Sequence, residues 1–366
     1  MHDRGSFTAR ASLVLVLGLL SLFSTTLPAQ EAGHAHQHGG AVPPMDAEGK
    51  RLESYQVKHK LDQAMIDRLR AKIPLYRGMT DMELKMNMAG MGPNYEWYAS
   101  DLSLRGDVGV LILSHGVGEN SDRMMKTALE PVSRRWPTAI GFGMAMMQSS
   151  HLQSAVDDLV AHGAKTIVLV PSGVITKYNS LTRQWKYIFD LGDEQATYLD
   201  VPKVRSSAKF VMTRHLADDP LVTEMLYDHI REVSRNPANE VVIIVGHGPE
   251  DVEDNKKDLA IVQVHAQRLQ AKNEFADVKL INLQDDAIPP IRASNVRKLR
   301  RWVKQADGQG RDVIVVALAA ASHGVQTHIR QDLHGLDYRF ADKGLSENPK
   351  YIDWVVSAIE EAVAGL

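Results

Sequence analysis

The chain has 366 residues, enough for two domains of ordinary size that each bury a core of their own. It contains no cysteine, which excludes disulfide-stapled folds and lipid attachment through an N-terminal cysteine. The formal net charge is −3 and no basic block runs along any segment, so a general nucleic-acid binder is disfavoured.

Residues 1–30 have the layout of a secretory signal peptide. Arg4 and Arg10 precede an apolar run from Ala11 to about Leu27, which is broken by Pro28 and followed by small residues. A retained membrane anchor is the alternative, but the run is short for a span. We expect export, a periplasmic or secreted mature protein, and no stable membrane span after removal of the signal.

Residues 31–50 are predicted to be a flexible linker that carries His34, His36 and His38. Alternate imidazoles on a mobile chain can chelate a borderline divalent metal. A solvated tail without a ligand is an equally good interpretation.

Residues 51–106 are predicted to form an N-terminal helical and methionine-rich arm. Apolar residues recur at helical spacing between Arg51 and Arg70, and methionines are dense from Met79 to Met91. Thioethers can hold Cu(I), yet methionines more often fill gaps or line an adaptable apolar surface. We interpret this segment as an arm that packs on the rest of the chain and could cover a site.

Residues 107–236 alternate apolar strands with amphipathic helices. The predicted strands are 108–113, 138–147 and 166–170, and the predicted helices are 122–135 and 152–162. Strands that alternate with helices imply a parallel sheet with right-handed crossovers.

Residues 237–366 repeat this order. The predicted strands are 241–245, 278–283 and 313–318, and the predicted helices are 259–272 and 294–306. In each half the first strand ends in a His-Gly step, at His115 and at His247. A Pro-led amphipathic helix follows at a nearly equal interval, after Pro220 and after Pro349.

This agreement indicates an internal duplication. The predicted fold class is α/β, with two duplicated doubly wound parallel-sheet domains that face a cleft. Each copy places an imidazole just past the carboxyl end of a buried strand, where open α/β sheets build their sites.

These motifs, in this order and repeated, resemble the class II tetrapyrrole chelatases of the sirohydrochlorin cobalt chelatase type. The likeness rests on the two His-Gly steps, the passage Gly163–Pro171 and the Pro-led terminal helix, and it covers both repeats. It implies a chelatase-like fold and an enzyme that inserts Co²⁺, or in relatives Ni²⁺ or Fe²⁺, into a carboxylate-rich macrocycle without a nucleotide.

The resemblance also implies site residues. His247 matches the first metal-binding histidine of the family, and His328, within Gly324–Leu333, matches the second. Asp285 and Asp286 lie where the family often has an acidic residue. The first repeat keeps His115 as a further candidate ligand, but its loop 171–177 has no histidine and its segment 147–150 has no carboxylate. A complete site is therefore expected in the second repeat.

The chemistry requires these residue types. Metal insertion removes two pyrrole N–H protons, so a base must lie beside the metal ion. The protein must also hold that ion with few ligands, so that it can be released to the macrocycle. Two neutral imidazoles leave coordination positions open, and a nearby carboxylate raises their basicity. Arg292 and Arg297 are candidate cations for the carboxylates of the substrate. Their helix also carries Lys298, Arg300 and Arg301, a pattern equally typical of a solvated face.

Two functions remain open. The first is an exported chelatase-like lyase that loads a divalent metal, most readily Co²⁺ but also Ni²⁺, Fe²⁺ or Zn²⁺, into a sirohydrochlorin-type tetrapyrrole. The second is a non-enzymatic periplasmic metal-binding protein on the same scaffold. A homo-oligomer is compatible with both, and His323 fits a ligand or a loop residue equally. Serine hydrolases and nucleotide kinases are disfavoured, because the chain has neither a nucleophile elbow nor a phosphate loop.

Overall fold

The computed structural model describes residues 56–57, 61–72, 74–90, 94–95, 97–116, 119–143, 149–192 and 201–366. These residues belong to one compact unit, His38–Leu366. The predicted signal peptide and histidine linker, including His34 and His36, lie outside the described residues. Within the described part, no helix is long and apolar enough to cross a membrane.

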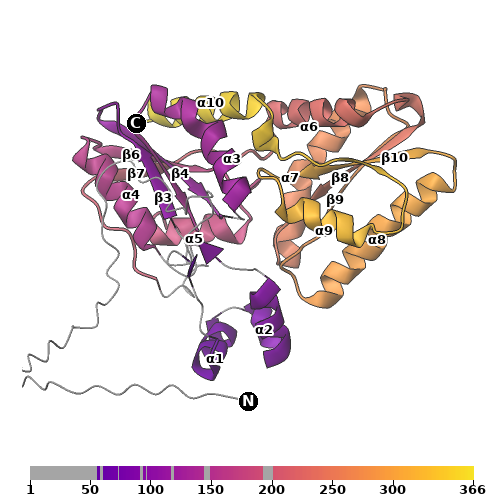
Figure 1. Ribbon diagram of the computed structural model, residues 1–366, viewed down its shortest axis with the longest axis horizontal. Coiled ribbons are helices and arrows are strands. Elements are labelled where there is room, and N and C mark those ends of the chain that lie inside the picture. The colour runs from indigo at the N-terminus through magenta and orange to yellow at the C-terminus, as the bar shows by residue number, and fades with distance from the viewer. Residues whose placement is uncertain are drawn as a thin grey trace, which may run out of the picture. The chain divides into compact units, whose positions relative to one another are not determined.

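The first sheet has five strands in the order β3-β5-β4-β6-β7 (Figure 1). Its strands are β3 (Trp97–Asp101), β4 (Val108–Ser114), β5 (Thr138–Phe142), β6 (Thr166–Pro171) and β7 (Lys209–Met212). Four of them run parallel, whereas β3 pairs with β5 in the antiparallel direction. Its repeat contributes α3 (Glu119–Leu129), the 3₁₀ turn η3 (Glu130–Arg134), α4 (Ser150–Ala161) and α5 (Ser180–Ile188).

The second sheet has four strands, all parallel, in the order β11-β10-β8-β9. Its strands are β8 (Glu240–Gly246), β9 (Asp277–Asn282), β10 (Asp312–Leu318) and β11 (Arg339–Ala341). Its repeat contributes η5 (Pro237–Asn239), α7 (Val252–Ala271), α8 (Pro289–Asp307), α9 (Gly324–Asp332) and η6 (Leu345–Glu347).

The two sheets share one strand order, β5-β4-β6-β7 in the first and β9-β8-β10-β11 in the second. The glycines after the two site histidines also adopt the same left-handed backbone, with φ of 76° at Gly116 and 73° at Gly248. A side chain at such a φ is strained, so glycine suits both turns. The predicted α/β fold of duplicated parallel-sheet domains is confirmed, and His115 and His247 occupy equivalent positions.

The terminal helices are exchanged between the repeats. Helix α6 (Pro220–Val233) ends the first repeat but packs on β10 and β11 of the second sheet. Helix α10 (Lys350–Ala364) ends the second repeat but packs on β6 of the first sheet, where the Tyr351 hydroxyl donates a hydrogen bond to the Ser172 carbonyl at 2.7 Å. The predicted boundary between residues 236 and 237 therefore divides the repeats in sequence, while each sheet is completed by the other repeat.

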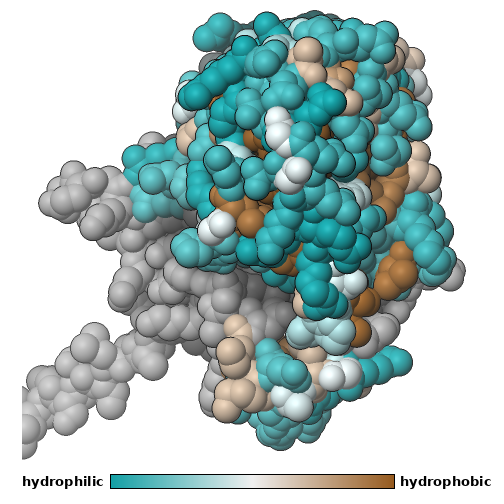
Figure 2. Space-filling view, turned by 90° about the vertical axis from the view of Figure 1, so that its right-hand side faces the viewer, coloured by the Kyte–Doolittle hydropathy of each residue, from teal (hydrophilic) through white to brown (hydrophobic). Residues whose placement is uncertain are grey.

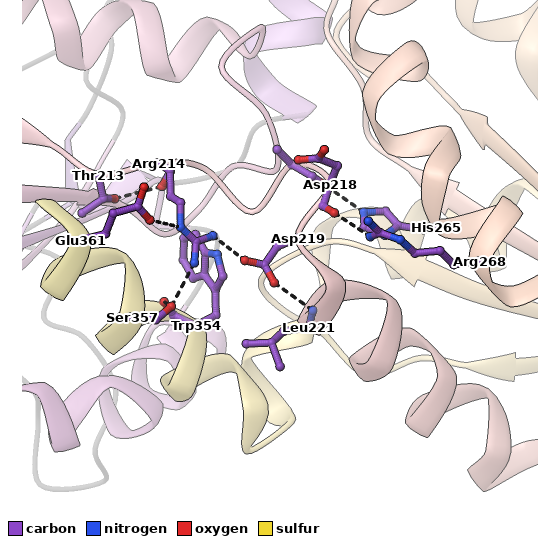
Figure 3. Close-up of polar contacts among 11 residues, drawn as sticks. Thr213, Arg214, Asp218, Asp219, Leu221, His265, Arg268, Trp354, Ser357 and Glu361 are labelled. Carbon is purple, nitrogen blue, oxygen red and sulfur yellow. Dashed lines mark hydrogen bonds and ion pairs between the residues drawn. The ribbon is translucent and has the colours of Figure 1, made fainter.

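Arg214 lies where the chain leaves the first sheet for α6 (Figure 3). Its guanidinium donates to Glu361 at 2.8 Å and to Ser357 at 3.0 Å, both on α10, and it pairs with Asp219. Asp219 in turn caps α6 by accepting a hydrogen bond from the Leu221 amide at 2.9 Å. One arginine thus joins the start of one exchanged helix to the body of the other.

Most strand residues are buried on both faces, as in parallel sheets covered by helices. The largest core cluster contains residues of both sheets together with apolar side chains of α6 and α10, among them Ile230 and Trp354. The exchange therefore makes one continuous core out of two repeats.

Local details differ from the sequence-based expectations. The helix predicted at 259–272 begins earlier, at Val252, because the Asp251 side chain caps it by accepting from the Asp254 amide. The strand predicted at 138–147 ends at Phe142, before residues 144–148, which lie outside the described part. Elements α5, β7 and β11 were not predicted, because they are short or carry many polar residues.

The segment predicted as an arm contains several elements. They are β1 (Gln56–Val57), α1 (Gln63–Lys72), the 3₁₀ turn η2 (Pro74–Gly78), α2 (Asp81–Gly90), β2 (Asn94–Tyr95), which pairs with β1, and β3. Helix α1 begins at Gln63, later than the spacing suggested. Strand β3 extends the first sheet by one antiparallel edge strand, so residues 97–101 are part of the first domain in space.

Candidate active site

His247 stands in a tight turn at the carboxyl end of β8. Its Nδ1 lies 2.8 Å from the carbonyl oxygen of Gly248. Because a carbonyl can only accept, Nδ1 carries the proton and the lone pair of the neutral ring is on Nε2. That Nε2 lies 3.5 Å from Oδ2 of Asp286, and the two side chains are 36% and 51% exposed. The predicted His247 and Asp286 are therefore brought together.

Gln284 links this turn to the carboxylates. It is buried at the end of β9 in a left-handed backbone conformation, with φ of 56°. Its main-chain amide donates to the His247 carbonyl at 2.7 Å, and its side-chain amide donates to the Pro249 carbonyl at 3.0 Å. The sequence reasoning missed Gln284, since only the unusual backbone and these contacts reveal its role.

Asp285 joins His328 to the same turn. Its side chain is only 1% exposed, and its Oδ2 lies 3.1 Å from Nδ1 of His328 on α9. The contact is a pairing of charges and not an aligned hydrogen bond, since neither atom has a hydrogen-bond partner among the described residues. The two predicted residues are thus each other's only close polar contact at these atoms.

Arg292 neutralises Asp285 from the other side. Its Nε lies 3.0 Å from Oδ1 of Asp285, and its two Nη atoms lie 3.2 and 2.8 Å from the oxygens of Asp332. Asp332, at the end of α9, was not singled out from the sequence. Since the guanidinium is engaged by two carboxylates, its predicted role as a cation for the substrate would require breaking these pairs.

Arg297 is exposed on α8, and so are Lys298, Arg301 and Lys304, while Leu299 and Val303 are buried. Exposed residues on this side of the molecule are largely hydrophilic (Figure 2). The basic residues of α8 therefore form the solvated outer face of an amphipathic helix, and nothing in their contacts singles out Arg297.

His115 faces the second-repeat residues from the first repeat. Burial lowers the pKa of its imidazole, the Asp286 carboxylate opposes this effect, and His247 adds to it. His115 is held neutral beside His247 and Asp286.

The other pKa shifts follow from the same contacts. Burial acts to lower the pKa of His247, but Asp286 and Asp285 outweigh it and the pKa is raised. Contact with Asp285 raises the pKa of His328. Burial acts to raise the pKa of Asp285, yet His328, His247 and Arg292 outweigh it and hold the pKa below its usual value. The site combines one neutral imidazole with two imidazoles of increased basicity.

The described residues contain no group of three or more His, Asp or Glu side chains arranged to hold a metal ion together. The candidate ligands His115, His247 and His328 therefore do not form a closed structural metal site.

The methionine-rich helices contact this region through Ile288. Their own small core consists of Ile66, Tyr76, Met79 and Leu84, and Ile288, two residues after Asp286, packs against it. Met82 and Met86 on α2 are 67% and 66% exposed. The segment thus rests on the loop that carries the site carboxylates, while two of its methionines face solvent.

No protein-family model and no curated protein sequence matches this chain. Among solved structures, SirB from Bacillus subtilis with Fe3+ aligns with a TM-score of 0.52 at 15% identity, covering 70% of this chain and 96% of SirB. The described part of the chain therefore shares the chelatase-like fold of SirB.

Another solved structure, DR2241 from Deinococcus radiodurans, is described as a multi-domain protein with structural similarity to chelatases and two additional domains. It aligns with a TM-score of 0.44 at 16% identity, covering 69% of this chain and 54% of DR2241. At such identities the likeness concerns the fold of the chelatase-like domains, and their chemistry has to be argued from the site.

Proposed function

We propose that this chain is an exported metal chelatase that inserts a divalent metal ion into a sirohydrochlorin-type tetrapyrrole. The observation that carries the proposal is the 3.5 Å approach of His247 Nε2 to Asp286 Oδ2 beyond the carboxyl end of β8. The choice of Co²⁺ rests on the resemblance of the motifs, and export rests on the layout of residues 1–30.

The chemistry of that pair favours a cation. When His247 is neutral, its Nε2 lone pair faces a carboxylate oxygen, because the ring proton is on Nδ1. Two lone pairs repel each other unless a proton or a metal ion lies near both. Divalent ions such as Co²⁺, Ni²⁺ and Fe²⁺ bind imidazole nitrogen and carboxylate oxygen as ligands.

The same residues can take up the protons that insertion releases. His328 has its Nδ1 3.1 Å from Asp285, so the carboxylate stabilises the ring when the ring takes up a proton. Arg292 keeps Asp285 ionised for this purpose. The half-exposed Asp286 is a second acceptor beside the metal position.

The test is incubation of the protein without residues 1–30 with sirohydrochlorin and Co²⁺, Ni²⁺ or Fe²⁺, followed by absorbance. We expect insertion faster than the protein-free rate, and little of it in the His247→Ala variant. His334→Ala, an exposed histidine in the same repeat, is the matched control. Rates equal to the protein-free reaction with every metal would reject the proposal.

A metal-binding protein that takes no macrocycle is the second candidate. The observation in its favour is Arg292, whose guanidinium is engaged by Asp285 and Asp332 and so is not free to bind a substrate carboxylate. Metal binding without any insertion in the same assay would support this alternative.

A further inference from the structure

The two repeats differ in the residue beneath the site histidine. In the first sheet Ser114, just before His115, pairs in register with Phe142. In the second sheet Gly246, just before His247, pairs with Asn282. A buried amide therefore stands where the first repeat has a buried phenyl ring.

The Asn282 side chain presses on the backbone at both sides of His247. A β-carbon on Gly246 would lie 2.4 Å from Oδ1 of Asn282, and one on Gly248 would lie 2.5 Å from its Cβ. Gly248 supplies the carbonyl that accepts from the His247 ring. The position of the Asn282 side chain thus fixes the Gly248 carbonyl to which the His247 ring is hydrogen-bonded.

Asn282 is itself held by two acceptors on α7. Its Nδ2 donates to Oδ1 of Asn255 at 2.8 Å and to Oδ2 of Asp258 at 2.7 Å. Both amide hydrogens are thereby used, which allows only one orientation of the amide group. Asn282 and Asp258 are almost completely buried, so an unmade hydrogen bond here would be costly.

The second oxygen of Asp258 reaches into the other repeat. Oδ1 accepts a hydrogen bond from the hydroxyl of Thr176, a buried residue in the loop after β6. The adjacent pair Arg183 and Asp254 connects the same two segments. The polar network beneath His247 is therefore completed by a residue of the first repeat.

The loop that carries Thr176 also touches the His115 turn. A β-carbon on Gly173 would lie 3.4 Å from the main-chain nitrogen of His115, which leaves little room between the two backbones. Tyr351 holds the start of this loop through the Ser172 carbonyl at 2.7 Å. One short loop thus contacts the His115 turn at one end and the support of His247 at the other.

We propose that Thr176, Asp258 and Asn282 are positioning residues that set the orientation of the His247 ring according to the position of the first-repeat loop. The inference rests on the proposed role of His247 in the site. The loop that carries Thr176 would then fix the position of the His247 turn relative to the His115 turn. The orientation of the His247 ring would depend on the contact between the two repeats.

The experiment observes the His247 ring without metal or substrate. The ring nitrogens of histidine-labelled protein are recorded by long-range ¹H–¹⁵N spectroscopy at one pH, with His247→Gln used to assign the signals. Thr176→Val removes the hydroxyl donor, and Asn282→Asp places two carboxylates against each other. The double variant Asp258→Asn/Asn282→Asp restores one donor facing one acceptor between positions 258 and 282. Thr182→Val is the matched control, since this buried threonine contacts His215 within the first repeat.

We expect the Nδ1 signal of His247 to shift in Thr176→Val and in Asn282→Asp, to return in the double variant, and to stay unchanged in Thr182→Val. If Asn282→Asp does not fold, Thr176→Val against Thr182→Val decides alone. An unchanged His247 signal in Thr176→Val overturns the inference, whatever the activity.

The insertion assay then separates the inference from the proposed function. If the protein inserts metal, Thr176→Val should raise the KM for Co²⁺ by about tenfold, the usual scale for groups that orient a metal ligand. If the His247 signals respond as expected but the unaltered protein inserts no metal, the positioning role stands and the proposed function fails.

Discussion

His247 and Asp286 meet with Nε2 of the imidazole 3.5 Å from Oδ2 of the carboxylate, just past the carboxyl ends of two neighbouring strands. Two backbone hydrogen bonds, from the Leu283 amide to the Gly246 carbonyl and from the Gln284 amide to the His247 carbonyl, tie the two turns together. The pair is thus held by main-chain geometry, while its side chains remain partly exposed to a ligand.

This pair predicts the pH dependence of insertion. Only the neutral imidazole can bind metal, and Asp286 and Asp285 raise the pKa of His247 above its ordinary value. The rate should therefore rise with pH, with a midpoint above about 6.5. Asp286→Asn removes the largest upward influence, so its midpoint should move to lower pH. Initial rates between pH 5.5 and 9, roughly the range in which imidazoles titrate, measure both profiles. A midpoint that does not move would show that another group controls the rate.

The two histidines outside this pair should differ in their effect. His328→Ala removes the base supported by Asp285, so we expect insertion to be abolished. His115→Ala removes one neutral nitrogen from a repeat that has no histidine in its loop 171–177 and no carboxylate in its segment 147–150, so most activity should remain. Initial rates of the two variants decide, and loss of activity in His115→Ala alone would move the working site to the first repeat.

Metal binding should not depend on the histidine linker. The protein that lacks residues 31–50 should still bind one Co²⁺ or Zn²⁺, because His247 and Asp286 lie in the folded part. Calorimetry measures this, with His247→Ala in the same truncated protein expected to bind more weakly by a few kcal/mol at most, as one of few protein ligands is lost. Loss of all binding with the linker would mean that the proposed site holds no metal.

Arg292 should matter for stability. It is a main neutraliser of the buried Asp285, and removal of one partner from a buried ion pair costs about 3 to 5 kcal/mol. Arg292→Ala should lower the free energy of unfolding by an amount near the lower end of that range, because the arginine is partly exposed. Urea unfolding checks the value, with Arg297→Ala on the exposed face of α8 as the control. Equal effects of the two variants would contradict the assigned role of Arg292.

The buried His151 and the partly buried His215 predict acid sensitivity. Burial lowers the pKa of His151 to about 3 and that of His215 to about 4. The unfolded chain binds protons below pH about 6.5 while the folded rings stay neutral, so stability is full above that pH and falls down to about pH 4 for His215 and about pH 3 for His151. Each ring contributes on the order of a few kcal/mol to this loss. His215→Gln should make the decline of the urea midpoint shallower, whereas the exposed His323→Gln should not.

The sequence alone predicts three strands and the two helices between them in each repeat, the duplication, and the placement of His115 and His247. These follow from local causes: apolar runs long enough for buried strands, and a glycine that permits the left-handed turn after each histidine. Asp285, Asp286 and His328 could also be named, because a resemblance of motifs indicated them. Their mutual contacts could not.

Contacts between segments that are far apart in the chain became known only from the folded structure. The exchange of α6 and α10, the antiparallel edge strand β3, the engagement of Arg292 by two carboxylates and the support of His247 by Asn282 all depend on through-space packing. Apolar periodicity reports which face of an element is buried but not which partner covers it. For this reason the sequence indicated a site in the second repeat, whereas the fold brought a loop of the first repeat into its support.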